Sequence, residues 1–113
     1  MNAPDTSAPG IGQGSASPNP INQTGYPPDR STITVYATDD IGVDSVVASW
    51  PTTGPIPGGS ASLSPSGNSW SFTFGPYYIP GSSYAVPITI TAYDAAGNQS
   101  STVVSVTVSY LLI

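Results

Sequence analysis

Three aspartates are the residues of this sequence whose type and spacing could support chemistry. Each follows a stretch of alternating apolar residues. Asp39 and Asp40 lie in the segment 33–42, Asp94 lies in the similar segment 88–97, and a glycine ends both segments. Gathered carboxylates are ligands of calcium, which takes about six to eight oxygens. A carboxylate pair can also serve glycoside hydrolysis. One hypothesis is therefore a Ca²⁺ site formed by Asp39, Asp40 and Asp94.

The alternative for these aspartates is structural: each one opens a turn. An aspartate oxygen can accept backbone N–H bonds within a turn that Gly42 or Gly97 then closes. Adjacent Asp39 and Asp40 would also point to opposite faces if their strand continued, which weakens a shared metal site. Nothing in the sequence around them is suited to raise a carboxyl pKa or to hold a sugar for hydrolysis. The turn interpretation is favoured, and no cofactor is predicted.

The ionisable side chains are few, and they exclude several classes of function. The 113 residues include six acids and a single base, Arg30, with no Glu, Lys, His or Cys. A serine or threonine nucleophile would have no His or Lys to activate it, and zinc, haem and iron–sulfur centres would lack their usual ligands. A net charge of −5 repels phosphates, which argues against nucleic acid and anionic membranes as partners. We predict a protein that is not an enzyme.

Short stretches of alternating apolar and polar residues, separated by Gly and Pro, predict an all-β domain. In the clearest stretch, 69–75, Trp70, Phe72 and Phe74 share one face, and with Trp50 they are expected to form the bulk of the core. Residues 1–30 are rich in Pro, Gly, Ser and Asn, and we expect an extended arm that includes an edge strand over 11–17 and adds little to the core. The remaining expected strands cover 32–38, 43–50, 61–63, 69–75, 86–92 and 104–110.

Counting the edge strand of the arm, these patterns predict about seven antiparallel strands, the number of an immunoglobulin-like sandwich of two sheets. That sandwich is expected to span residues 31–113. Five segments carry a more specific pattern: Pro-Asp-Thr-Ser-Ala-Pro at 4–9, Ala-Thr-Asp-Asp-Ile-Gly-Val at 37–43, Asp-Ser-Val-Val-Ala-Ser-Trp at 44–50, Gly-Asn-Ser-Trp-Ser-Phe at 67–72 and Thr-Ala-Tyr-Asp-Ala-Ala-Gly-Asn at 91–98. Together they resemble a bacterial Ig-like repeat over nearly the whole chain.

The resemblance implies a fold more firmly than a role, because the family is a scaffold for many functions. Such repeats, related in shape to fibronectin type III modules, occur in tandem in secreted enzymes and adhesins, and singly or in pairs on phage virion proteins. This sequence begins at a Met without a signal peptide pattern and ends on a hydrophobic tail where a linker to the next repeat would be expected. These features favour a stand-alone module.

Three groups of apolar side chains are candidates for contact with a partner. The aliphatic tail at residues 111–113 gains free energy only if it folds back on the domain or docks on a partner. The alternative is that it extends the last strand and covers a sheet edge. The loop tyrosines suit a protein or a host-surface carbohydrate, or else they pack over the end of the sandwich. The arm is expected to order on a neighbouring subunit. The candidates are Leu111, Leu112 and Ile113 in the tail, Tyr77 and Tyr78 in the loop, and Ile11 in the arm.

The expected function is that of a non-enzymatic virion protein, an Ig-like module that decorates or cements a phage capsid or tail. Its partners would be other protein subunits, either a capsid or tail protein or further copies of itself, and it would lie on the virion surface. The alternative is an accessory repeat of a secreted bacterial enzyme or adhesin, outside the cell or on its surface, serving as a spacer or a weak carbohydrate binder. A low-charge, acidic exterior would keep the outward-facing virion module soluble.

Overall fold

The computed structural model describes residues 8–39 and 42–110. In these residues the chain forms ten strands and no helix, so the all-β prediction is confirmed. Over the same ranges, no segment forms a helix long and apolar enough to cross a membrane. The strands are β1 (Gly10–Ile11), β2 (Ser15–Ser17), β3 (Ile21–Asn22), β4 (Ser31–Thr38), β5 (Val43–Trp50), β6 (Gly59–Ser62), β7 (Ser64–Ser66), β8 (Ser69–Phe74), β9 (Tyr84–Asp94) and β10 (Gln99–Ser109).

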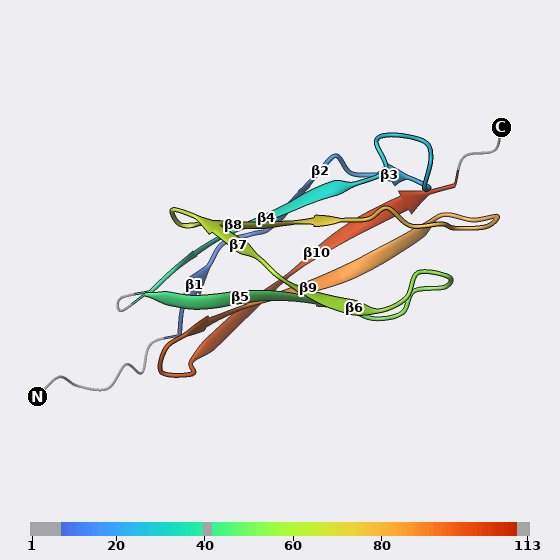
Figure 1. Cartoon of the computed structure of the whole chain (residues 1–113). Helices are drawn as coiled ribbons and strands as arrows, with labels where there is room; N and C mark the ends of the chain where they lie inside the picture. The colour runs from blue at the N-terminus through green and yellow to red at the C-terminus, as the bar shows by residue number, and fades with distance from the viewer. Residues whose placement is uncertain (1–7, 40–41, 111–113) are drawn as a thin grey trace, which may run out of the picture.

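The strands form two five-stranded sheets around one core, an arrangement compatible with a β-sandwich (Figure 1). The first sheet has the order β1–β4–β8–β7, and β2 also pairs with β4; the second has the order β3–β10–β9–β5–β6. These strand pairs are antiparallel except β3 with β10, which is parallel. The described strands outnumber the seven expected because the segment before residue 30 supplies three short strands and the segment 59–66 supplies two.

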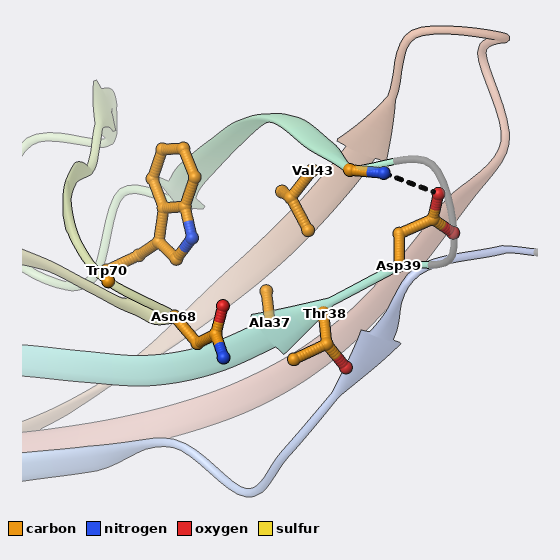
Figure 2. A pocket seen from close by; sticks show the side chains of 8 residues that line it. Ala37, Thr38, Asp39, Val43, Asn68 and Trp70 are labelled. Atoms are coloured by element: carbon orange, nitrogen blue, oxygen red, sulfur yellow. Dashed lines mark hydrogen bonds between the residues drawn. The ribbon is translucent and has the colours of Figure 1, made fainter.

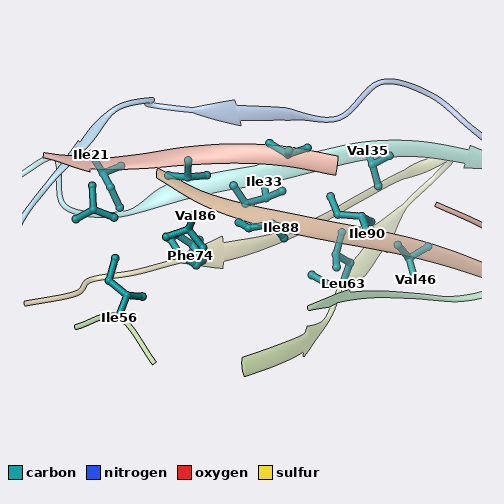
Figure 3. Packing of buried hydrophobic residues seen from close by; sticks show 14 of the residues in the cluster. Ile21, Ile33, Val35, Val46, Ile56, Leu63, Phe74, Val86, Ile88 and Ile90 are labelled. Carbon is teal, nitrogen blue, oxygen red and sulfur yellow. The ribbon is translucent and has the colours of Figure 1, made fainter. Parts of the chain in front are cut away.

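Period-2 alternation explains which side chains face inward. Along most of β4, β9 and β10 the inward residue of each pair is apolar and buried, so the two sheets meet through aliphatic side chains (Figure 3); Ser31 and Asp94 are the buried polar residues at the ends of β4 and β9. The exposed positions between them carry mostly Ser and Thr, which suit a solvated strand surface. The buried aliphatic residues of these three strands are Ile33, Val35, Ala37, Val86, Ile88, Ile90, Ala92, Val104, Val106 and Val108.

Aromatic side chains form one margin of the core rather than its bulk, which corrects the expectation from the sequence. Phe74 is 1% exposed, whereas Trp50, Trp70 and Phe72 are half-buried and pack against the aliphatic core. The Trp50 ring stacks on Phe72 with 5.9 Å between centroids and meets Phe74 edge-on at 5.3 Å. An indole carries an N–H that needs a partner when buried. Trp50 Nε1 finds one at the rim, where it donates to the carbonyl oxygen of Pro57 at 3.2 Å.

The segment expected to be an extended arm lies against both sheets over residues 10–22. β1 and β2 extend the first sheet beside β4, and β3 joins the second sheet beside β10. Ile21 on β3 is 0% exposed and belongs to the core, although little core contribution was expected from this segment. Gly75, at φ +99°, permits the close approach, because a Cβ there would lie 2.7 Å from the Asp29 carbonyl oxygen and 3.3 Å from Ile21 Cδ1.

Candidate functional site

The connections β4–β5 and β9–β10 lie at one end of the molecule, which we call the acid end because Asp39 and Asp94 are there (Figure 1). Register brings the two connections together, since Val43 pairs with Asp94 across β5 and β9. Asp39 and Asp94 therefore lie at the same end of the fold. Asp40 lies outside the described residues. In the ranges that the structure describes, no group of three or more potential metal-binding side chains gathers.

Asp94 is a buried turn residue whose carboxylate is used by the turn that it opens. Its Oδ1 accepts hydrogen bonds from the backbone N–H groups of Ala96 at 3.0 Å and Asn98 at 2.9 Å. Its Oδ2 accepts one from Asn98 Nδ2 at 2.9 Å. Gly97, at φ +89°, supplies the left-handed conformation of the turn. This is the geometry of the turn interpretation, and a calcium ion would have to compete with these donors for the same oxygens.

Replacing Asp94 by alanine is expected to lower the free energy of unfolding by about 1–3 kcal/mol, because the N–H groups of the turn lose a charged acceptor in a partly buried place. Equilibrium denaturation in urea measures the change. Asp44→Ala is the matched control: Asp44 is exposed at the register shift between Val43 and Ser45, and its replacement should cost less than about 0.5 kcal/mol. Equal losses for the two variants would contradict the role given to Asp94.

The Asp39 carboxylate borders a pocket of about 300 Å³ at the acid end (Figure 2). Asp39 Oδ2 accepts a hydrogen bond from the N–H of Gly42 at 3.3 Å, so this aspartate also braces its own turn. Asn68 lines the pocket from the β7–β8 turn and Trp70 from β8, while Ala37 and Val43 line it from β4 and β5. The pocket offers an indole, an amide and a carboxylate for contact. Asp39 is the titratable side chain among its lining residues.

The opposite end of the molecule carries tyrosines, and we call it the tyrosine end. It comprises the connections β3–β4 and β8–β9 and the end of β10 (Figure 1). The connections are joined by a hydrogen bond from the Thr24 N–H to the Tyr77 carbonyl oxygen at 2.9 Å. The Tyr110 N–H donates to Ser83 Oγ at 2.9 Å, which ties the end of β10 to the same region. These bonds fix the backbone that presents the side chains of Tyr26, Tyr77, Tyr78, Tyr84 and Tyr110.

Tyr77 and Tyr78 are neighbours with opposite environments. Tyr77 is half-buried, and its ring lies 4.9 Å from that of Phe74 between centroids. Burial raises the pKa of the Tyr77 phenol, and a side-chain hydrogen bond with Trp50 partly offsets that rise. Tyr78 is 69% exposed. Ile79, which follows it, is fully buried, so Tyr78 projects from a loop held on both sides by buried or half-buried residues. Of the two loop candidates, Tyr78 is the one available to a partner.

The other candidates for partner contact differ in what can be said of them. Ile11 is half-buried on β1, where it pairs with Ala37 and packs against the core, so most of its apolar surface is used within the chain. The tail residues Leu111, Leu112 and Ile113 lie outside the described residues. Among the described strand residues, two exposed large apolar side chains were not singled out from the sequence, Tyr36 on β4 and Val103 on β10. Both occupy outward positions of an alternating strand, which is the signal that could have found them.

The candidate sites are therefore surfaces for contact: an open pocket at the acid end, an exposed tyrosine on an anchored loop, and outward side chains on the sheets. The sequence supplies none of the His, Lys or Cys partners that usually activate a nucleophile. Comparison of the chain with models of known protein families and with the sequences of curated proteins finds no match.

Proposed function

We propose that this protein is a non-enzymatic Ig-like module that attaches to a larger protein assembly, a phage virion, through its tyrosine end. The order of the strands supports the Ig-like part of the proposal. The chain leaves the first sheet after β4, forms β5 and β6 in the second, returns for β7 and β8, and then crosses again for β9 and β10. Alternation of this kind between two antiparallel sheets is characteristic of immunoglobulin-type sandwiches.

The observation that carries the attachment is the exposed side chain of Tyr78 on an anchored loop. Tyrosine is enriched at protein interfaces, since it buries a large ring while its hydroxyl keeps a hydrogen-bond partner. Tyr77 and Ile79 hold the backbone on either side, and the Thr24 N–H bonds to the Tyr77 carbonyl. Because the backbone of this loop is already held, binding costs mainly the side-chain freedom of Tyr78, and more of its contact free energy is retained as affinity.

The two ends of the molecule support an orientation for the attached module. Asp39 and Asp94 lie at the acid end, and the β8–β9 connection that carries Tyr78 lies at the opposite end (Figure 1). With the tyrosine end docked, the acid end points away from the assembly. A net charge of −5 then keeps that exterior hydrated and disfavours contact between neighbouring modules at that end.

Copurification with virions tests the proposal. An epitope-tagged chain is supplied in cells that produce the particles, the particles are banded in a density gradient, and the tag is quantified against the major coat protein. The chain should band with the particles at a fixed ratio. Tyr78→Ser should lower occupancy at limiting chain concentration by at least about fivefold, because a central interface tyrosine contributes about 1–2 kcal/mol or more.

Tyr36→Ser is the matched control for that experiment, since Tyr36 is an exposed tyrosine on the outer face of β4 and away from the tyrosine end. Occupancy should be unchanged by this substitution. A chain that stays at the top of the gradient would contradict attachment to the particle. A chain found only as part of a longer secreted polypeptide would favour the accessory repeat of an enzyme or adhesin instead.

A further inference from the structure

The two tryptophans of the chain differ in what their rings contact. The Trp50 ring is used within the fold, because it stacks on Phe72 and donates from Nε1 to the Pro57 carbonyl oxygen. Among the described residues, no ring contact and no hydrogen bond engages the Trp70 indole. Trp70 packs against the core only in part, and its side chain also lines the pocket at the acid end (Figure 2). The pocket therefore contains an aromatic ring and an N–H donor that the fold does not use.

Main-chain pairing holds the backbone of Trp70 and Asn68 in place before any ligand arrives. Trp70 lies on β8 with a strand on each side, opposite Val35 of β4 and Pro65 of β7. Asn68 is in the β7–β8 turn, and its carbonyl oxygen accepts a hydrogen bond from the N–H of Ala37 on β4 at 3.0 Å. Because the backbone is already fixed, a ligand has to order only the two side chains, and less of its contact free energy is lost.

The rest of the pocket combines apolar and polar groups. Ala37 is buried and Val43 is half-buried, whereas Asn68 is exposed. Asp39 is half-buried, and its Oδ2, which accepts from the Gly42 N–H, belongs to a carboxylate with about four acceptor positions. An amide both donates and accepts hydrogen bonds, and a carboxylate only accepts them. The pocket thus offers an aromatic surface, an amide and an acceptor of hydroxyl hydrogens.

These groups complement a pyranose sugar. One face of such a ring consists of C–H groups that pack on an aromatic ring, and the hydroxyls at its edge both donate and accept hydrogen bonds. A volume of about 300 Å³ is at the lower end of the range for small-molecule sites, so it suits one sugar ring. The Asp39 carboxylate is the charged group among the lining residues, and it repels the carboxylate of an acidic sugar.

We propose that the acid-end pocket binds one neutral pyranose residue of a glycan. The Trp70 indole packs on the C–H face of the sugar, the Asn68 amide bonds to hydroxyls at the edge of the ring, and Asp39 accepts a charge-assisted hydrogen bond from a hydroxyl. Gly42 and Gly67 also line the pocket and are exposed, and a Cβ at either glycine would meet no atom of the described residues within 4 Å. The next sugar of the glycan therefore has room to leave the pocket.

The sugar site and the attachment surface lie at opposite ends of the molecule. The pocket is at the acid end, and the loop of Tyr78 is at the tyrosine end (Figure 1). Sugar binding does not depend on attachment, but in a module docked through its tyrosine end the pocket faces outward, where a glycan of a host surface can reach it. One sugar ring supplies few contacting atoms, so we expect weak binding, with Kd on the order of 1 mM.

Titration of the full chain with methyl glycosides, followed through backbone amide shifts in NMR spectra, tests the proposal. The probes are the methyl pyranosides of glucose, galactose, mannose and N-acetylglucosamine, each raised to about 50 mM, well above the expected Kd. At least one should shift the amides of Ala37, Val43 and Asn68 saturably and leave the amide of Tyr78 unmoved. Because the glycosidic methyl group stands for the rest of a glycan, a site that accepts the free sugars and excludes these glycosides would overturn the assignment.

Substitutions at the pocket give the test its specificity. Trp70→Ala should raise Kd at least about tenfold, and Asn68→Ala at least about threefold. Trp70→Phe retains a ring and should keep Kd within about fivefold, which separates loss of the ring contact from loss of the fold. Tyr36→Ala is the matched control: Tyr36 pairs with Ser69, the neighbour of Trp70, but is exposed on the outer face of the same sheet, and its truncation should leave Kd within about twofold.

The charge of the ligand tests the role of Asp39. The uronate form of the glycoside that binds best should bind the wild-type chain at least about fivefold more weakly than the neutral form, because two carboxylates would meet. Asp39→Asn should bring the two within about twofold. The proposal is overturned if none of the four glycosides gives a saturable shift, if binding survives Trp70→Ala, if the uronate binds the wild-type chain as well as the neutral sugar, or if tetramethylammonium binds the pocket more tightly than any of the glycosides. None of these outcomes bears on attachment through the tyrosine end.

Discussion

Replacing Phe74 by alanine is expected to lower the free energy of unfolding by about 3–5 kcal/mol, the range for deleting a fully buried aromatic side chain. Phe74 is 1% exposed, with its ring centroid 5.3 Å from that of Trp50 and 4.9 Å from that of Tyr77. The change removes these ring contacts and leaves a cavity that strands on both sides cannot close without losing register. Because domains of this size are stable by only about 5–15 kcal/mol, this loss is a large fraction of the total stability and should lower the urea midpoint of unfolding accordingly.

Urea denaturation, followed by tryptophan fluorescence and by circular dichroism, measures this loss. Tyr36→Ala is the matched control, because Tyr36 is an aromatic residue on the outer face of β4, and its truncation should cost less than about 1 kcal/mol. Phe74→Leu should recover part of the loss, since it retains most of the buried volume. Similar losses for Phe74→Ala and Tyr36→Ala would mean that the aromatic margin of the core is not packed as described.

The second large effect is expected at Ile21, in the Pro-rich segment before the long strands. Ile21→Ala should cost about 2–5 kcal/mol, because Ile21 is fully buried beside β10 and its loss opens a cavity between the sheets. The same change would release β3 from its short pairing with Val108 and Ser109. If residues 1–30 were an arm held only by a neighbouring subunit, the substitution would leave the stability of the isolated chain within about 0.5 kcal/mol.

Two further variants make the test at Ile21 specific. Ile21→Val should cost about 0.5–1.5 kcal/mol, in proportion to the single methylene removed. Ile11→Ala, the same truncation at a half-buried position on β1, should cost less than Ile21→Ala. Thermal unfolding of the purified protein gives the ranking. A ranking in which Ile11 exceeds Ile21 would contradict the packing of β3 against the core.

Both large effects concern the same strip of the molecule on which the proposed attachment depends. Phe74 supports the ring of Tyr77, and the buried Ile79 follows Tyr78, so the core holds the loop that presents Tyr78. β3 and the preceding Asn19 lie along β10. Core packing therefore determines which surface groups are available, and losses of stability should weaken attachment through Tyr78.

The elements of the fold could be predicted from the sequence because alternation is a local property. Ile33, Val35 and Ala37 recur at every second position, and that period alone sets one face of the strand toward the core. The same period holds in the expected strand 104–110, where Val104 and Val106 face inward. The turn at Asp94 was also readable, since an aspartate followed by Gly97 suits a tight turn whatever surrounds it.

The sequence by itself determined an all-β chain, the inward faces of its long strands, and a chemistry without His, Lys or Cys. Only the tertiary structure decided that Ile21 is a core residue and that Asn19 bonds to Ser105 and Thr107. It also placed Asp39, Asn68 and Trp70 around one pocket. The physical reason is distance along the chain. Burial of one residue in a Pro-rich segment, and the pairing of its neighbours with a strand more than eighty positions away, depend on which surfaces meet after the sheets have formed, and no local periodicity encodes that.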